Sequence, residues 1–180
     1  MNITGGKFRG QKISSPDSKF TRPTLSKTRE SIFNVLFSMM DFENKSFLDM
    51  YSGSGIMGIE ALSRGFSSVF CIEKNPNAAN IIKKNYASLG LKPNLVVGDA
   101  IKVISHLDRS FDVIYIDPPY ESDLYEKSLN ALKNLKHLSK KSIIILEHSR
   151  EISFDGFKLI KQKKYSQKYI TFISPTELQE

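Results

Sequence analysis

Four consecutive residues, Asp117, Pro118, Pro119 and Tyr120, follow an apolar run at 111–116 and combine groups that can hold an aromatic amine. Two successive prolines stop a strand from pairing further and keep the chain extended, with carbonyl groups pointing outward. The carboxylate of Asp117 and the carbonyl of Pro118 can then accept the two amine hydrogens, while Tyr120 stacks on the ring. Two such acceptors favour a pyramidal nitrogen whose lone pair can attack a methyl sulfonium, with most of the acceleration coming from positioning. The alternative is a structural turn with an incidental tyrosine.

A glycine-rich segment lies between a short apolar run and a helical pattern, and it contains Asp49, Ser52, Gly53 and Gly55. Glycines allow a tight turn and a close backbone approach, and the start of the following helix offers free N–H groups. Such a loop suits a nicotinamide dinucleotide and an adenosyl cofactor about equally, although some loops of this kind bind no ligand. Glu73 ends the next predicted strand, where a carboxylate can accept hydrogen bonds from both hydroxyls of a ribose.

Asp99 and Ala100 follow a third short apolar run, at 95–97. The Asp99 carboxylate can accept a hydrogen bond from the exocyclic amine of an adenine. An ordinary N-cap of the helix that follows explains an aspartate at this position equally well. Both interpretations stay open from the residues alone.

The elements that must position these residues indicate an α/β fold, because short apolar runs alternate with helical patterns from residue 46 onward. We expect a mostly parallel seven-stranded sheet with helices on both faces. The predicted strands span 47–50, 68–73, 95–97, 111–117, 142–146, 157–164 and 169–174, the last two forming an antiparallel hairpin. The predicted helices span 26–40, 56–64, 76–89, 100–107 and 124–135. Ligands of open parallel sheets bind outside the carboxyl ends of the strands, which is where the residues above fall.

The amino terminus predicts a small basic hairpin or arm at 1–25, ahead of a single domain at 26–180. The chain has 180 residues and a net charge of +7, of which residues 1–30 carry +5. Lys7, Arg9 and Lys12 suit phosphate contacts rather than base reading, because nothing in this segment pairs an aromatic stacking group with hydrogen-bonding side chains. Arg22 and Arg29 flank a helix start and suit either substrate contact or support of that helix. A solvated face is the alternative for the whole segment.

A second basic excess lies on the predicted terminal hairpin, with no acidic residue between Asp155 and Glu177. It comprises Lys158, Lys161, Lys163, Lys164 and Lys168. The sequence favours neither a solvated face nor an RNA contact for this group.

Several classes of protein are disfavoured by what the sequence contains. One cysteine, Cys71, cannot form an internal disulfide and lies in an apolar run, so we expect a packed thiol and a reducing compartment. His106, His137 and His148 have no partner at metal-ligand spacing, so we expect no metal site. The sequence shows no signal peptide and no apolar run approaching about 20 residues. We therefore expect a cytoplasmic protein that does not enter a membrane.

Taken together, these motifs resemble those of class I S-adenosylmethionine-dependent methyltransferases, which have a Rossmann-like fold. The segment from Asp117 to Tyr120 resembles the signature of enzymes that methylate exocyclic amines of nucleobases. The resemblance extends to the RsmD family, bacterial enzymes that methylate N2 of a guanine in 16S rRNA, over about residues 1–175. It is carried by the segments 5–10 (Gly-Gly-Lys-Phe-Arg-Gly), 22–24 (Arg-Pro-Thr), 29–33 (Arg-Glu-Ser-Ile-Phe) and 49–55.

The resemblance implies roles for individual residues. Asp49, Gly53 and Gly55 would shape the methionine end of a pocket for S-adenosyl-L-methionine, whose product is S-adenosyl-L-homocysteine. Ser52 of the same loop would also bind the cofactor. Glu73 would hold the ribose, and Asp99 and Ala100 would border the adenine. Asp117, Pro118, Pro119 and Tyr120 would receive the guanine, and Lys7, Arg9, Lys12, Arg22, Thr24 and Arg29 would contact RNA. The implied partner is 16S rRNA in an assembled or assembling small ribosomal subunit, and we expect a monomer.

Three other functions remain as alternatives. A DNA adenine-N6 or other base-amine methyltransferase shares the chemistry, but 180 residues leave little room for a target-recognition domain. A nicotinamide dehydrogenase shares the glycine-rich loop and Glu73 but does not explain the Pro-Pro-Tyr turn. A non-catalytic RNA-binding assembly factor could keep the fold, although intact Asp117 and Tyr120 argue against it.

Overall fold

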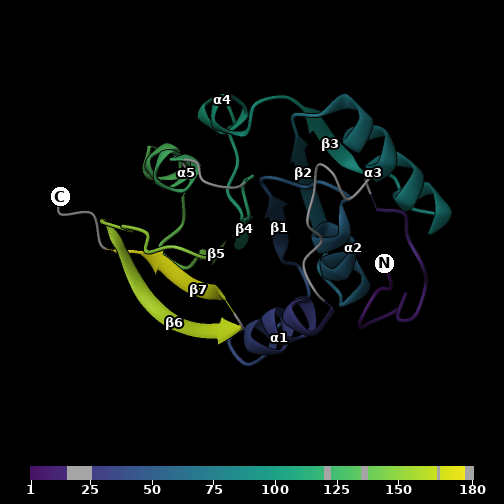
Figure 1. The fold of residues 1–180 in the computed structure, drawn as a ribbon, viewed down its shortest axis with the longest axis horizontal. Coiled ribbons are helices and arrows are strands. Elements are labelled where there is room, and N and C mark those ends of the chain that lie inside the picture. Colours follow the sequence, from purple (N-terminus) through teal and green to yellow (C-terminus); the bar gives the residue numbers. More distant parts are fainter. Residues whose placement is uncertain (16–25, 120–122, 135–137, 166, 177–180) are drawn as a thin grey trace.

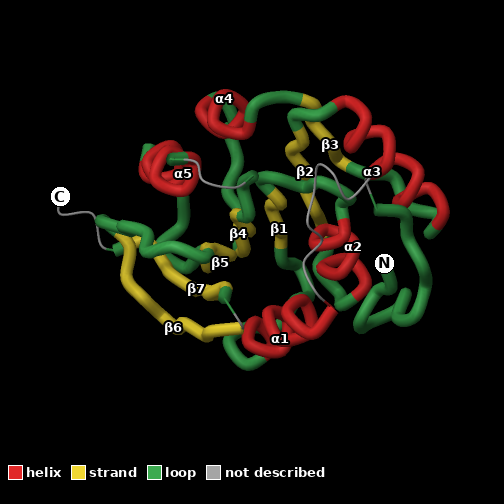
Figure 2. Tube along the Cα trace, viewed as in Figure 1, coloured by secondary structure: helices red, strands yellow, loops and turns green. Residues whose placement is uncertain are grey.

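The computed structural model describes residues 1–15, 26–119, 123–134, 138–165 and 167–176. Its strands are β1 (Ser46–Asp49), β2 (Ser68–Glu73), β3 (Asn94–Val97), β4 (Val113–Ile116), β5 (Ile143–His148), β6 (Phe157–Tyr165) and β7 (Lys168–Pro175). Its helices are α1 (Ser26–Phe37), α2 (Ile56–Ser63), α3 (Pro76–Ser88), α4 (Ala100–Ser105) and α5 (Leu124–Lys133). Figures 1 and 2 show the strands forming a central sheet with helices on either side.

One seven-stranded sheet runs in the order β3-β2-β1-β4-β5-β7-β6. The first five strands are parallel, whereas β7 pairs antiparallel with both β5 and β6. The predicted α/β architecture and its terminal hairpin are therefore confirmed. The strand order reverses between β1 and β4, so the carboxyl ends of these strands border the crevice where ligands of open sheets bind.

Each face of the sheet has its own helices and its own apolar cluster. Helices α1, α2 and α3 cover one face, where Phe33, Phe47 and Ile82 belong to one buried cluster. Helices α4 and α5 cover the other, with Leu48 and Leu129 in a second cluster. Adjacent residues of one strand, such as Phe47 and Leu48, fall in different clusters because side chains alternate along a strand. Across the described ranges, no helix is both long and apolar enough to cross a membrane.

Most strand ends differ from the sequence prediction by one or two residues, and two of these differences involve polar residues. β4 begins at Val113 rather than at 111, and the Asp112 carboxylate just before it accepts hydrogen bonds from Ser46, from its N–H at 2.9 Å and its hydroxyl at 2.8 Å. β5 continues past the apolar run to His148, which pairs with Tyr169 of β7. The second difference brings two polar residues into the interior.

Residues 1–15, the described part of the amino-terminal arm, form a single antiparallel bridge, between Asn2 and Lys12, instead of a regular hairpin. Two backbone hydrogen bonds flank this bridge. Ile3 N–H donates to the Gln11 carbonyl at 3.0 Å, and Ile13 N–H donates to the Met1 carbonyl at 2.8 Å. Ile3 and Ile13 are buried in the same cluster as α1 and α2. The arm is therefore packed onto the α1–α2–α3 face.

Candidate active site

A cavity of about 1130 Å³ opens at the carboxyl ends of the parallel strands. The glycine-rich loop after β1, Glu73 at the end of β2 and the Asp117–Pro119 segment after β4 all line it. Residues that are up to 68 positions apart in the sequence, from Asp49 to Asp117, thus share one space because the strands that carry them are parallel neighbours.

The glycine-rich loop needs its glycines at two positions. Gly53 and Gly55 have φ of 54° and 78°, a region that side chains rarely adopt. At Gly55, which caps α2, a Cβ would also lie 3.2 Å from side-chain atoms of Ile82 and Tyr86 in α3. At Gly53, nothing lies within 4 Å of the Cβ position, so the loop leaves open space there. The loop therefore packs closely against α3 at Gly55 and leaves room at Gly53.

Asp49 places a carboxylate without a hydrogen-bond partner inside the cavity wall. The residue is 1% exposed, and neither of its carboxylate oxygens has a hydrogen-bond partner among the described residues. Burial, reinforced by the negative charge of Glu73, raises the pKa of Asp49 to about 7. A buried carboxylate in this state is suited to a cationic group of a ligand, whose charge would favour the ionised form.

Glu73 is fixed by the backbone of two loops. Its Oε2 accepts a hydrogen bond from Gly53 N–H at 2.7 Å, and its Oε1 accepts one from Asn75 N–H at 2.8 Å. Asn75 in turn caps α3, and its side chain accepts from Asn77 N–H at 2.8 Å. Each carboxylate oxygen of Glu73 keeps a second lone pair for a ligand hydroxyl. The residue is therefore held in place at the cavity with acceptor capacity left.

Asp99 serves as the N-cap of α4, the structural alternative raised by the sequence. Its carboxylate accepts from Lys102 N–H at 3.3 Å and forms an ion pair with Lys74 at 3.5 Å. The capping bond to Lys102 lowers the pKa of Asp99. Asp99 and Ala100 also line the cavity, so the cap does not remove them from a ligand's reach.

The Asp117–Pro118–Pro119 segment begins directly after the last residue of β4. Asp117 is partly buried, Pro118 is buried and Pro119 is exposed, and all three line the cavity. Burial and the neighbouring negative charge of Glu147 raise the pKa of Asp117 well above its usual range, and the positive charge of Lys168 opposes this. Tyr120, the fourth predicted member, lies outside the described residues, as do Arg22 and Thr24.

A fifth strand end contributes residues that the sequence did not assign to this site. Glu147 of β5 is 2% exposed and accepts hydrogen bonds from the Tyr115 hydroxyl at 2.7 Å and from Lys168 Nζ at 2.5 Å. Tyr115, Glu147, His148 and Lys168 all line the cavity. The available signal was the polar pair Glu147-His148 immediately after an apolar run, the same pattern that marked Asp49, Glu73 and Asp117.

The predicted RNA contacts of the arm lie at different distances from the cavity. Lys7, Arg9 and Lys12 are exposed. The turn that carries Lys7 is held at the carboxyl end of α2, where Lys7 N–H donates to the Ser63 carbonyl at 2.6 Å. Because α2 starts at the cavity and rises about 1.5 Å per residue, this turn lies about 10 Å along the helix from the site. The chain then returns to the cavity, which Ser15 lines.

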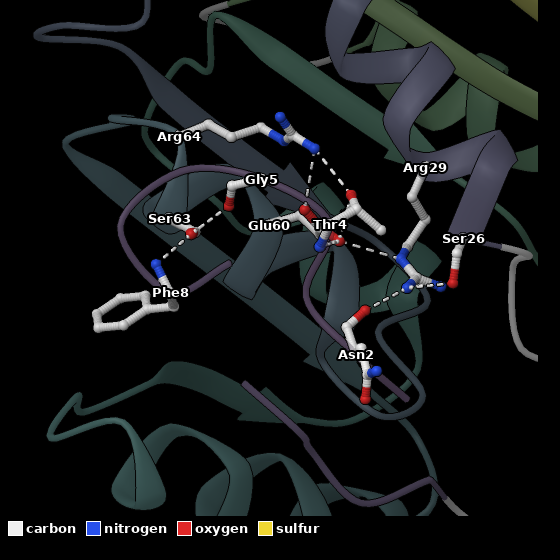
Figure 3. A network of polar contacts seen from close by, with 9 residues as sticks. All are labelled: Asn2, Thr4, Gly5, Phe8, Ser26, Arg29, Glu60, Ser63 and Arg64. Carbon is white, nitrogen blue, oxygen red and sulfur yellow. Dashed lines mark hydrogen bonds and ion pairs between the residues drawn. The ribbon is translucent and has the colours of Figure 1, made fainter. Parts of the chain in front are cut away.

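Arg29 does not fit the predicted contact with RNA, because the structure buries it. The side chain is 1% exposed and forms an ion pair with Glu60, which is 0% exposed, at 3.2 Å. Its Nη2 donates to the Asn2 carbonyl at 2.7 Å, and Thr4 donates to the same Glu60 carboxylate from its N–H and hydroxyl, each at 2.8 Å. Figure 3 shows this network joining α1, α2 and the arm. Arg29 therefore links the arm to α1 and α2 and does not face a substrate.

The second basic excess lies at one edge of the sheet. Lys158, Lys161, Lys163 and Lys164 belong to β6, the outermost strand, far along the sheet from the glycine-rich loop. Lys168 differs from them, because it begins β7 and reaches the cavity.

Comparison with known proteins adds evidence from nearly the whole chain. The family model described as Conserved hypothetical protein 95 matches residues 1–174. The Ribosomal RNA small subunit methyltransferase D of Buchnera aphidicola subsp. Acyrthosiphon pisum is 34% identical over 155 residues, covering 84% of this chain and 79% of that protein. The protein of the same name from Escherichia coli K12 is 31% identical over 152 residues, covering 84% and 76%.

Solved structures with the same fold include the Escherichia coli protein yhhF, with a TM-score of 0.85, 26% identity and 97% of both chains covered. A Thermus thermophilus protein gives a TM-score of 0.82 at 25% identity, covering 97% of this chain and 99% of that one. The resemblance expected from the motifs is thus confirmed along the chain. Family model and relatives agree that this chain is a member of the RsmD family of methyltransferases.

Proposed function

We propose that this chain transfers a methyl group from S-adenosylmethionine to the exocyclic N2 amine of a guanine in 16S rRNA. One observation carries the proposal: the amine-binding segment Asp117–Pro118 and the cofactor-type residues Asp49 and Glu73 line one cavity. Membership of the RsmD family supports the rRNA substrate, since the relatives named above are small-subunit rRNA methyltransferases.

The cavity suits S-adenosylmethionine at the β1–β2 side. When bound, this cofactor supplies an electrophilic methyl group carried on a sulfonium. The unpartnered carboxylate of Asp49 would face the positive charge of the methionine portion, with Ser52 and the open space at Gly53 beside it. Glu73, already fixed by Gly53 and Asn75, would accept from the ribose hydroxyls. Asp99 and Ala100 would border the adenine.

The β4 side of the same cavity suits the amine of a guanine. An ionised Asp117 carboxylate and the Pro118 carbonyl would accept the two N–H bonds of the amine and orient its lone pair. This orientation substitutes for a strong base, because most of the rate gain in such a transfer comes from placing the two reactants in line. The raised pKa of Asp117 also suits it to take the proton that the methylated nitrogen releases. Tyr120 would stack on the base.

The RNA would be held mainly by phosphate contacts from Lys7, Arg9 and Lys12, with Arg22 and Thr24 as further candidates. These contacts position the RNA without reading its bases. The substrate would be rRNA in an assembled or assembling small subunit.

A methyl-transfer assay tests this function. The purified protein is incubated with labelled S-adenosylmethionine and with small subunits or 16S rRNA from cells that lack the gene, and the methylated nucleoside is identified by mass spectrometry. We expect N2-methylguanosine. An Asp117→Ala variant should lose roughly 100-fold or more of the rate, while calorimetry shows near-normal binding of S-adenosylhomocysteine. The exposed Asp155→Ala serves as the matched control.

Other products would redirect the assignment. Methylation of adenine in DNA would favour the base-amine alternative, and thermal stabilisation by NAD but not by S-adenosylhomocysteine would favour a dehydrogenase. A complete lack of transfer to every form of the rRNA would favour a non-catalytic assembly factor. Near-normal turnover by Asp117→Ala would reject the role given to that carboxylate.

A further inference from the structure

Glu147 is a buried carboxylate with both oxygens engaged at the edge of the cavity. Tyr115 donates to Oε2 at 2.7 Å, and Lys168 Nζ contacts Oε1 at 2.5 Å. The Lys168 side chain is 25% exposed and lines the cavity, while its ammonium contacts the buried carboxylate. The three residues come from β4, β5 and β7, the strands on the side of the cavity away from the glycine-rich loop.

The sheet register places Asp117 beside this pair. Ile116 of β4 pairs with Leu146 of β5, so the next residues, Asp117 and Glu147, follow side by side at the carboxyl ends of two parallel strands. Side chains two positions apart share a face of the sheet, so Asp117 lies on the face of Tyr115, whose hydroxyl reaches Glu147. Two neighbouring carboxylates away from water disfavour each other's ionised form unless a cation stands close to them.

The other charged groups around Asp117 do not supply that cation. Asp49 of β1 is negative when ionised and acts in the same direction as Glu147. His148 of β5 has its pKa lowered by burial, and its ring contacts the Arg150 carbonyl at 2.6 Å and the Thr171 hydroxyl at 2.8 Å. The Arg150 guanidinium is paired with Glu126, at 2.7 and 2.9 Å. Among the described residues, Lys168 supplies the cation: its ammonium contacts Glu147, which follows the register neighbour of Ile116, and its positive charge acts on Asp117.

We propose that Lys168 and Glu147 are positioning residues for methyl transfer: Lys168 keeps Asp117 charged and therefore able to accept from the amine, and Glu147 with Tyr115 fixes the place of the Lys168 ammonium. This inference rests on the role of Asp117 in the proposed function and assigns the terminal hairpin a part in it. A protonated Asp117 would present an O–H donor to an amine that needs acceptors. The competing explanation is that the Glu147–Lys168 pair only ties β7 to β5.

The two explanations differ in the pH dependence of the transfer rate. Activity that needs an ionised Asp117 falls as the pH drops through the pKa of that group. Removing the nearby cation in Lys168→Met should move this acidic limb to higher pH, by about one unit or more. Removing the neighbouring negative charge in Glu147→Gln should move the limb to lower pH. A purely structural pair has no reason to give displacements of opposite sign.

The experiment records rates of methyl transfer to 16S rRNA from pH 5 to 9 at saturating substrates, for wild type and for both variants. Lys168→Arg keeps the charge and should leave the limb near its wild-type position. Lys45→Met is the matched control, because it breaks an ion pair with Asp112 (3.1 Å) at the other end of β4 and should not move the limb. Asp117→Asn keeps an acceptor that does not titrate, so its profile should lose the limb altogether.

Thermal denaturation and binding of S-adenosylhomocysteine at each pH establish that every variant compared is folded. If Glu147→Gln does not fold, the contrast between a displaced limb in Lys168→Met and an unmoved limb in Lys168→Arg still distinguishes the two explanations. An active wild type whose limb stays in place in Lys168→Met overturns the positioning role and leaves the proposed function standing. A wild type that transfers no methyl group to guanine N2 overturns both.

Discussion

The backbone N–H of Gly53 donates a 2.7 Å hydrogen bond to the carboxylate of Glu73, which joins the loop after β1 to the end of β2. Through this bond, an acidic residue 20 positions after Gly53 is tied to the backbone of the loop that we propose to hold the cofactor. A hydrogen bond donated by a backbone N–H to a carboxylate contributes about 1.5–3 kcal/mol, and the proposed ribose contacts would use the same carboxylate.

Glu73→Ala should therefore weaken binding of S-adenosylhomocysteine by about 10- to 100-fold, through lost ribose contacts and a less ordered loop. Isothermal calorimetry measures the affinity, and the exposed Glu43→Ala provides a control with the same change of charge. Unchanged affinity in Glu73→Ala would exclude the ribose contact.

Asp49 should make the unliganded protein less stable as the pH rises. Its pKa is about 7 in the folded state against an ordinary value of 3.8, so the folded chain binds this proton more tightly than the unfolded chain does. The free energy of unfolding then falls between about pH 4 and 7, by roughly 4 kcal/mol at most.

The Asp49→Asn variant has no ionisable group at this position. The difference in melting temperature between the variant and wild type should therefore shift in favour of the variant by several degrees from pH 5 to pH 8. The cost of burying the amide does not change with pH, and the difference between the two conditions isolates the ionisation. Equal gains at both pH values would contradict a raised pKa.

Much of this site could be predicted because the ends of the strands can be recognised in the sequence as acidic residues at the ends of apolar runs. Asp49, Glu73, Asp99 and Asp117 each follow an apolar run, and parallel pairing brings the ends of such runs together. The residues that were missed, Glu147 and Lys168, depend on partners from distant segments. Glu147 is buried because Tyr115 and Lys168 complete its hydrogen bonds, and the antiparallel pairing of β7 with β5 brings Lys168 there.

The burial of Arg29 also depends on a partner from a distant segment, and it favours the supporting role that the sequence had left open beside substrate contact. An arginine in the first turn of an amphipathic helix is exposed unless a buried carboxylate faces it, and Glu60 lies 31 positions away on another helix. The position of Glu60 inside an apolar helix, between Ile59 and Ala61, was the only local indication of such a partner.

Arg29→Met should consequently lower stability rather than RNA affinity. Losing the guanidinium leaves Glu60 with Arg64, at 3.3 Å, and with Thr4. Arg64 and Thr4 compensate the buried carboxylate only in part. We therefore expect the free energy of unfolding, measured by urea denaturation, to fall by about 3 kcal/mol. The exposed Arg9→Met should leave stability unchanged. A stable Arg29→Met variant with weakened RNA binding would restore the original prediction.

The basic turn of the arm should hold RNA through its charge alone. Lys7 and Arg9 are exposed on a turn that Gly6 allows to approach α2, since a Cβ at Gly6 would lie 1.8 Å from the Ser63 carbonyl oxygen. Removing one phosphate contact reduces the slope of log affinity against log salt by about 0.7 for single-stranded RNA. The double variant Lys7→Gln/Arg9→Gln should therefore flatten the slope by about 1.4 and weaken binding of different RNA sequences alike.

The matched variant Lys140→Gln/Lys141→Gln, on the loop before β5, makes the same change of charge away from the arm. Equal slopes for the two double variants would show that the arm acts only through the overall charge of the protein.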